Sequence, residues 1–141
     1  MLKGIPTYQT LLNSIRDNDK SVTEINLDSN QIGDAGAKEL AEALKVNQTI
    51  TRIHLTDNRI GDAGARELAE ALKVNQTITE IYLGGNHIGD AGAIELAEAS
   101  KVNQTITDIN LRHCKIGAAG ASMSLKDIGI VVPRLLLFVQ E

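Results

Sequence analysis

A segment of 28 residues recurs along this chain, and this internal repeat restricts the possible folds more than any other feature of the sequence. The copies occupy residues 21–49, 50–77 and 78–105, and a fourth copy begins at Ile106 and loses the pattern after Ala121. A fixed period of this length is typical of solenoid proteins, in which similar units stack side by side. We therefore expect a stack of repeats rather than a core around one centre.

Each copy has two halves with different hydrophobic periodicity. In the first half apolar and polar residues alternate, as in residues 80–83, and this alternation predicts a strand with one buried face. In the second half apolar residues recur at helical spacing, as at Ala93, Leu96 and Ala97. Because so short a strand is not stable alone, we expect the strands to form one parallel sheet covered by a row of helices.

The apolar residues, an Asn and a Gly keep fixed positions in every copy. In the second copy they are Ile50, Ile53, Leu55, Asn58, Ile60 and Gly61. This pattern closely resembles the ribonuclease-inhibitor type of leucine-rich repeat, in which Cys is the alternative to Asn, as at Cys114, and the resemblance extends from Ser21 to Ala121. It implies an α/β fold: a curved right-handed leucine-rich-repeat solenoid with a parallel sheet on the concave face and helices on the convex face. It also implies protein binding on the concave face. The same repeat type forms the ligand-sensing part of NOD-like receptors.

The whole chain, residues 1–141, is expected to form one repeat domain with a cap at each end. Residues 1–20 lack the strand pattern and carry apolar residues at helical spacing, which predicts an N-terminal capping helix. These apolar residues are Tyr8, Leu11, Leu12 and Ile15. The Asn- and Asp-rich residues before Val22 also resemble, over a short stretch, the start of the tropomodulin repeat domain. We interpret residues 106–141 as a degenerate last repeat followed by an apolar C-terminal cap.

Three sets of polar residues recur at fixed positions, and we assign each set a structural role. The residues expected to cap the N-terminus of their own helix are Asp34, Asp62 and Asp90. The residues expected to end each helix in a left-handed conformation are Asn47, Asn75 and Asn103. The residues expected to form a buried ladder that bonds the turn after each strand are Asn30, Asn58 and Asn86.

The composition argues against several classes of partner. The net charge is −4 and neither sign forms a long run, so a nucleic-acid partner is not expected. The single cysteine excludes an intramolecular disulfide framework. The N-terminal residues lack the apolar segment of a signal peptide, and the apolar run 134–139 is too short to span a bilayer. We therefore expect a cytoplasmic protein without a membrane partner.

The strand residues that do not enter the core are expected to face the concave side in columns, with neighbours about 4.8 Å apart. In one column Arg52 lies between two glutamates, and in the next His54 lies beside Tyr82. Tyr82 is expected to be an exposed anchor for a protein partner, and Gly84 and Gly85 predict a shallow pocket beside it. The predicted contact patch consists of Arg52, His54, Asp57, Glu80, Tyr82, Asn110, Arg112 and His113.

Catalysis and metal binding are not expected in this patch. His54 with Asp57, or His113 with Asp108, would be an acid–base pair, but no nucleophile lies in register with either pair. Cys114 follows His113 but falls on the buried Asn position. The His and Asp residues lack the spacing of a known metal-binding motif. We therefore expect a protein-interaction module without enzymatic activity, metal or cofactor.

Two other functions stay open at this point. The activating protein of the GTPase Ran has similar repeats, so the chain could regulate a bound GTPase through polar residues at the loop edge, where Arg59 and Asp62 are candidates. Alternatively, the chain is a self-associating fragment of a larger repeat protein. In that case the apolar segment 128–139 is expected to pair two copies in a homodimer.

Overall fold

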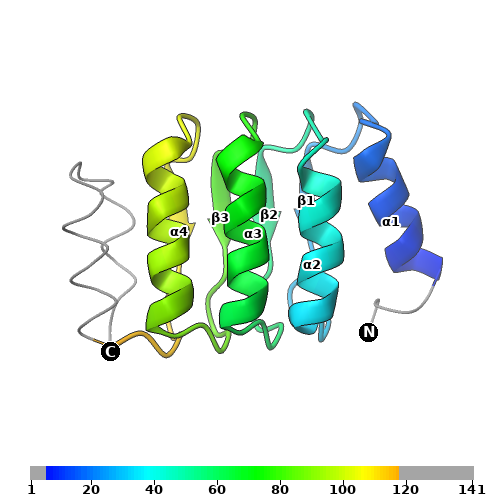
Figure 1. Cartoon of the computed structure of the whole chain (residues 1–141). Coiled ribbons are helices and arrows are strands. Elements are labelled where there is room, and N and C mark those ends of the chain that lie inside the picture. The colour runs from blue at the N-terminus through cyan, green and yellow to red at the C-terminus, as the bar shows by residue number, and fades with distance from the viewer. Residues whose placement is uncertain (1–5, 118–141) are drawn as a thin grey trace.

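The computed structural model describes residues 6–117, and these residues form four helices and four strands in alternating order (Figure 1). The helices are α1 (Pro6–Arg16), α2 (Gly33–Leu44), α3 (Asp62–Val74) and α4 (Asp90–Val102). The strands are β1 (Glu24–Asn26), β2 (Arg52–His54), β3 (Glu80–Tyr82) and β4 (Asp108–Asn110). From β1 onward the alternation follows the two halves of the sequence repeat.

The strands form one parallel sheet in the order of the sequence, β1-β2-β3-β4. Equivalent residues of consecutive repeats are paired, so that Ile25 lies opposite Ile53, and Ile53 opposite Ile81. This register and the α/β fold with parallel strands are the ones predicted from the repeat, and both are confirmed.

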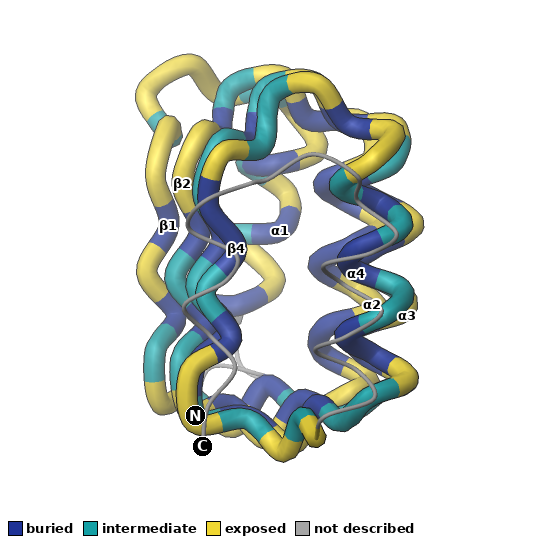
Figure 2. Tube along the Cα trace, turned by 90° about the vertical axis from the view of Figure 1, so that its left-hand side faces the viewer, coloured by how far each residue is buried: buried dark blue, intermediate teal, exposed yellow. Residues whose placement is uncertain are grey.

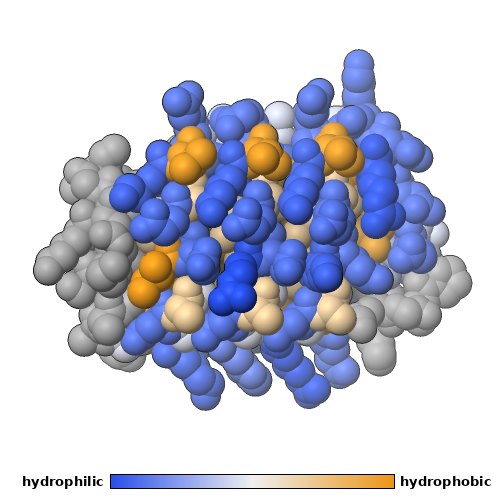
Figure 3. All heavy atoms as spheres, in the orientation of Figure 1, coloured by the Kyte–Doolittle hydropathy of each residue, from blue (hydrophilic) through white to orange (hydrophobic). Residues whose placement is uncertain are grey.

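The sheet and the helices form two layers joined by loops at both ends (Figure 2). Helices α2, α3 and α4 pack side by side along one face of the sheet. Between the layers lie the strand residues Ile53 and Leu55 and the helix residues Leu68 and Leu72. Their counterparts in the other repeats are also buried, except that the half-buried Ser100 takes the place of Leu72 in α4. The outer surface of the helix layer is mostly hydrophilic (Figure 3), so each helix has one apolar and one polar side.

Helix α1 covers the N-terminal end of this core beside α2 (Figure 1). Its residues Tyr8, Leu12 and Ile15 are buried, whereas Leu11 is only partly buried. The Tyr8 hydroxyl donates a 2.8 Å hydrogen bond to the carbonyl of Gly36 in α2, and burial raises the pKa of Tyr8. The described residues before β1 contain no strand, so β1 is the outer strand on this side of the described sheet.

The predicted ladder of asparagines joins consecutive repeats; Asn58 and Asn86 are buried as predicted, whereas Asn30 is only half-buried. Oδ1 of Asn58 accepts hydrogen bonds from the N–H groups of Asn30 and Ile32 in the preceding repeat, at 2.9 and 3.1 Å. Its Nδ2 donates to the carbonyls of Leu27 and Thr56. Each asparagine therefore satisfies backbone groups that the turn has removed from the sheet.

Equivalent bonds occur one repeat later at Asn86. In the fourth repeat Cys114 takes the position of the asparagine, and its Sγ donates to the carbonyl of Leu83 at 3.2 Å. The thiol is half-buried rather than fully buried as we predicted, and this partial burial raises the pKa of Cys114.

The asparagines after the helices do not adopt the predicted left-handed conformation, and that prediction is wrong. Asn75 has φ −79° and ψ 130°, and Asn103 has φ −74° and ψ 137°, which are extended values. Nδ2 of Asn75 donates to the carbonyls of Leu44 and Asn47 in the preceding repeat, and its Oδ1 accepts from the N–H of Ile78. The side chain thus satisfies backbone groups at the helix end without a left-handed residue.

The prediction that each recurring aspartate caps its own helix is also wrong. Oδ1 of Asp34 in α2 accepts hydrogen bonds from the N–H groups of Gly61 and Gly64 at the start of α3, at 2.7 and 3.0 Å. Asp62 makes the same pair of bonds to the start of α4. Since Gly61 holds the N-cap position and Asp62 is already the first helical residue, Asp62 is not in the geometry that caps its own helix.

Several predictions concern residues outside the described part of the chain. They are the degenerate end of the last repeat after Gly117, the apolar C-terminal cap and the pairing of two copies through residues 128–139. Within residues 6–117, no helix combines the length and the apolar character needed to cross a membrane.

Candidate functional site

The sheet face opposite the helices, which we call the open face, carries the strand side chains that do not enter the core. In each strand the middle isoleucine is buried against the helices, so the residues on either side of it belong to the open face. The first column contains Glu24, Arg52, Glu80 and Asp108. The second column contains Asn26, His54, Tyr82 and Asn110. One residue differs from the expectation of a surface column, since Asp108 is buried.

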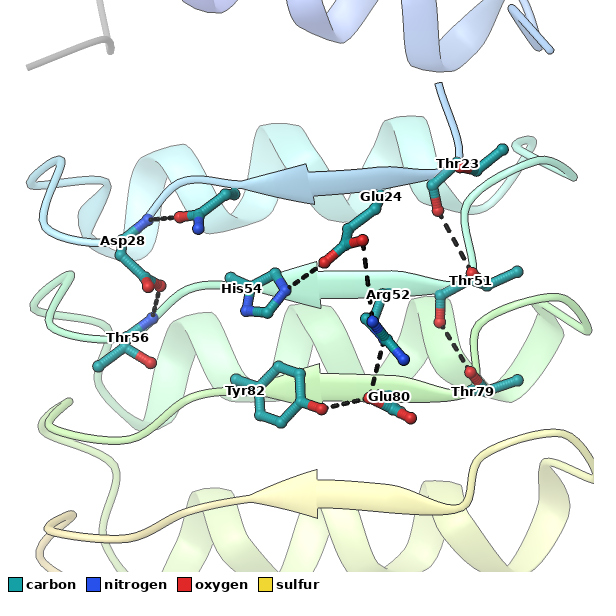
Figure 4. A network of polar contacts seen from close by, with 11 residues as sticks. Thr23, Glu24, Asp28, Thr51, Arg52, His54, Thr56, Thr79, Glu80 and Tyr82 are labelled. Atoms are coloured by element: carbon teal, nitrogen blue, oxygen red, sulfur yellow. Dashed lines mark hydrogen bonds and ion pairs between the residues drawn. The ribbon is translucent and has the colours of Figure 1, made fainter. Parts of the chain in front are cut away.

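Five side chains of the open face form a closed network, which we call the ring (Figure 4). Nε of Arg52 lies 3.0 Å from Oε1 of Glu80, and Nη1 lies 3.9 Å from Oε1 of Glu24. Oε2 of Glu24 lies 2.7 Å from Nε2 of His54. The His54 ring stacks on Tyr82 with ring centres 4.8 Å apart and planes inclined by 18°. The Tyr82 hydroxyl donates a hydrogen bond to Glu80 and closes the network.

Tyr82 is half-buried rather than exposed as we predicted, because other members of the ring cover part of it. The hydrogen bond to Glu80 is the main cause that raises the pKa of Tyr82 to about 12, with partial burial adding to the effect. The hydroxyl is therefore neutral near pH 7, and its proton is engaged by Glu80. A partner approaching the open face would meet an aromatic surface whose polar end already has an acceptor.

A cavity of about 410 Å³ opens beside the ring, toward the loops that follow the strands. Its lining consists of His54, Thr56, Asp57, Tyr82, Gly84, Gly85, Asn110, Arg112 and His113. The two glycines contribute backbone only, as the sequence suggested. Gly85 has φ +68°, and a Cβ atom at this position would lie 2.0 Å from Oδ1 of Asp57. The absence of a side chain at Gly85 therefore makes room for the Asp57 carboxylate.

The charged groups of the cavity differ from those of the ring, because they make no ion pair with any described residue. They are Asp57 and Arg112, and both are exposed, as is the imidazole of His113 beside them. The backbone that carries them is fixed, since the N–H of Arg112 donates to Oδ1 of Asn110 at 3.0 Å, and the N–H of Asp57 donates to the carbonyl of Gly84. The cavity thus presents charges of both signs on a defined backbone.

The structure brings the predicted contact residues together in two neighbouring groups. Six of the eight line the cavity, and the other two, Arg52 and Glu80, belong to the ring. Sequence reasoning left Thr56 and Glu24 out of the patch, although Thr56 lines the cavity and Glu24 belongs to the ring. Both residues occupy columns that already contained predicted members, so column position was the signal that could have found them.

One of the residues considered for other chemistry has a structural role. Asp62, a candidate for regulation of a GTPase, uses its carboxylate to bond the start of α4. Over the described range of the chain, no group of three or more His, Cys, Asp or Glu side chains is arranged to hold a metal ion.

Comparison with known proteins identifies the family. Residues 7–123 match the family described as the TMOD/LMOD leucine-rich domain. The solved structure of leiomodin-1 actin-binding site 2 is similar, with a TM-score of 0.80 and 26% sequence identity, over 87% of this chain and 73% of that chain. The tropomodulin C-terminal domain of Caenorhabditis elegans shares the fold, with a TM-score of 0.77 and 18% identity, over 84% and 74% of the two chains. No curated protein matches this chain. Because the family match covers most of its length, the chain belongs to the TMOD/LMOD leucine-rich domain family.

Proposed function

We propose that this chain is a protein-binding module whose partner is actin, and that it has no catalytic activity. The observation that carries the proposal is the similarity to leiomodin-1 actin-binding site 2, at 26% identity over 87% of this chain. Membership of the TMOD/LMOD family favours a binding role over the regulation of a GTPase.

We propose that the open face makes the contact, and that the ring and the cavity act differently. The ring side chains already hold one another, so little side-chain freedom is lost when a partner covers the His54–Tyr82 stack. In the cavity, Asp57, Arg112 and His113 have no ion-pair partner among the described residues and can pair with charges on the partner. The proposed contact therefore joins a preorganised surface to charges that are still open.

Three finer assignments belong to the same proposal. The repeats are of the ribonuclease-inhibitor type, the sheet lies on the concave side of the stack, and the module acts in the cytoplasm without a nucleic-acid or membrane partner. A homodimer through residues 128–139 is a separate proposal, which light scattering over a range of concentrations tests. A strict monomer would contradict it.

The test of the actin proposal is calorimetric titration with purified monomeric actin. Tyr82→Ala and Arg112→Ala are each expected to weaken binding by more than ~1 kcal/mol, because aromatic and arginine side chains dominate such contacts. The matched control is Glu42→Ala on the helix layer, where the side chain is 52% exposed, and this variant should bind like the wild type. Thermal melting of every variant separates lost contact from lost folding.

The outcomes distinguish the parts of the proposal. If the wild-type chain does not bind actin, the proposed partner is wrong. If it binds and neither substitution changes the affinity, actin remains the partner and the contact lies away from the open face. Accelerated GTP turnover by a small GTPase would instead favour the regulatory alternative.

A further inference from the structure

Three valines on the helix side of the molecule are exposed in a regular row. Val46, Val74 and Val102 have relative exposures of 55%, 58% and 55%, and they are the exposed large hydrophobic residues of the described chain. They follow the last turns of α2, α3 and α4 or end them. Figure 3 shows three separate hydrophobic patches in a row over these helix ends. We call these residues the valine row.

The valine side chains are exposed and do not belong to the buried core. The residues that follow the valines do have a structural role, since the Asn75 side chain bonds four backbone groups and the Thr77 hydroxyl bonds Asn75. Val74 is instead more than half exposed, although it recurs in every complete repeat as regularly as its bonded neighbours. Exposed apolar side chains that repeat in a regular row are available for contact with a partner that has apolar residues at matching intervals.

A lysine stands next to each valine of the row. Each valine directly follows a lysine, namely Lys45, Lys73 and Lys101, and the four residues after each lysine carry no charge. Lys45 lies 3.7 Å from Glu42 and Lys73 lies 3.2 Å from Glu70, but both pairs are on the surface, where such pairs contribute little. The lysines are therefore available to an acidic partner.

The surface is also hollowed between the valines. A cavity of about 340 Å³ lies between the C-terminal ends of α2 and α3. Its lining includes Val74 together with Lys45, Gln48 and Gln76. An apolar side chain of a partner that contacts Val74 would therefore have space to enter between two repeats.

The distance between successive valines indicates which shape of partner can contact all three. Packed helices lie about 8–10 Å apart, and α2, α3 and α4 are packed neighbours, so successive valines are separated by roughly the same distance. Seven residues of an α-helix rise about 10.5 Å. Residues seven apart also lie on nearly the same face of a helix, with a drift of only about 20°. A straight helix with an apolar residue at every seventh position thus comes close to matching the row, one apolar residue to each valine.

We propose that the valine row is a docking surface for an amphipathic α-helix of a partner protein, with one apolar residue per heptad and acidic residues on either side of that apolar line. This surface lies on the helix layer and not on the open face, so it does not depend on actin binding. The valines supply the apolar contact and the three lysines supply charge complementarity.

The test measures how a synthetic peptide binds to the full-length chain. The peptide has three heptads, with Leu at every seventh position and Glu on either side of each Leu. Binding is measured by fluorescence anisotropy. The triple variant Val46→Ser, Val74→Ser, Val102→Ser is expected to weaken binding at least about tenfold, and Lys73→Glu several-fold with a smaller salt dependence. The matched control is Ala35→Ser, Ala63→Ser, Ala91→Ser, which changes exposed residues at the opposite ends of the same helices and should bind like the wild type.

Because the valines are exposed, the triple variant is expected to keep the melting temperature of the wild type, so a failure to bind is not a failure to fold. A second peptide with Leu at every sixth position tests whether the leucines must share one face, because residues six apart point about 120° away from one another around the helix. It should bind at least about tenfold more weakly than the heptad peptide. Equal binding of the two peptides, or an unchanged affinity of the triple variant, would overturn the proposal. Binding to phosphatidylserine vesicles that the triple variant loses, without peptide binding, would assign the row to a membrane surface instead.

Discussion

Oδ1 of Asp62 lies 2.7 Å from the backbone nitrogen of Gly89, so a carboxylate in one helix caps the start of the next. A second bond from the N–H of Gly92 to the same oxygen, at 2.9 Å, completes the contact. Asp34 makes the same bonds to α3, and Asp90 bonds the N–H of Gly117. The free N–H groups at a helix start are thus satisfied across the boundary between repeats.

We expect Asp62→Ala to lower the free energy of unfolding by about 1–2 kcal/mol, the usual loss when a helix cap is removed. Asp62→Asn keeps an oxygen acceptor and should lose less. Urea denaturation measures both, and Glu70→Ala serves as the control because its pair with Lys73 lies on the surface. Equal stabilities of Asp62→Ala and Glu70→Ala would show that the contact contributes nothing.

Gly64→Ala is expected to destabilise the fold although Ala is the better helix former by about 1 kcal/mol. A Cβ atom at Gly64 would lie 2.7 Å from both Oδ1 of Asp34 and Cγ2 of Ile60, closer than these atoms can approach. These side chains or the helix that carries Gly64 must shift, at a cost of about 1–3 kcal/mol.

The matched control for this prediction is Gly61→Ala, at the N-cap position of the same helix. A Cβ atom there has its nearest neighbour at 3.5 Å, an ordinary contact, so the substitution should be tolerated. Thermal and urea melts of the two variants decide the matter, and a Gly64→Ala protein as stable as Gly61→Ala would refute the prediction.

Asn58→Ala should cost at least ~2 kcal/mol of unfolding free energy, because it leaves buried backbone donors and acceptors of two repeats without a partner. Asn30→Ala is the comparison, since Asn30 is only part-buried and its side chain bonds just the carbonyl of Asp28 among the described residues. The loss at Asn30 is expected to be less than half as large. Similar losses at the two positions would argue against a ladder that depends on burial.

Alkaline titration tests the hydrogen bond between Tyr82 and Glu80. The folded pKa of Tyr82, about 12, lies above its ordinary value of 10.0, so the bond stabilises the fold below pH 10.0 and this contribution is lost as the pH rises through about 12. Ultraviolet absorbance of the phenolate should therefore stay low at pH 10.0 in the folded chain, where the pKa of Tyr8 is also raised.

Glu80→Ala removes the acceptor and is expected to move the Tyr82 titration back toward pH 10.0. Urea-unfolded protein provides the reference, since both tyrosines of the chain should then titrate near that value. A folded wild-type chain in which one tyrosine ionises near pH 10.0 would contradict the assignment.

The repeat period was enough to predict the fold and the register of the sheet. Once Ile53 and Ile81 are equivalent, the pairing of Arg52 with Glu80 and of His54 with Tyr82 follows from stacking alone. The buried ladder at Asn58 and Asn86 was also predictable, because a polar residue at an apolar boundary needs backbone partners.

The errors share one physical cause, which is that rules for helix ends are local and the contacts are not. Asp34 and Asn75 stand where a single helix would be capped or ended. Asp34 instead accepts from N–H groups 27 and 30 residues away, and Asn75 donates to carbonyls 28 and 31 residues away. The half-burial of Tyr82 was missed for a related reason, since it depends on the side-chain conformations of His54 and Glu80. A periodic pattern determines which residues are neighbours, and not which of their atoms meet.

The direction of the aspartate contacts has a consequence for how such a chain can change in length. Each unit carries the acceptor for its successor, so an added copy of the whole unit finds a carboxylate in place and brings one for the copy after it. Loss of only part of a unit would instead leave a backbone N–H group without the aspartate that it needs from the preceding unit. A protein built in this way can gain or lose complete units during evolution, since no junction needs a new set of residues.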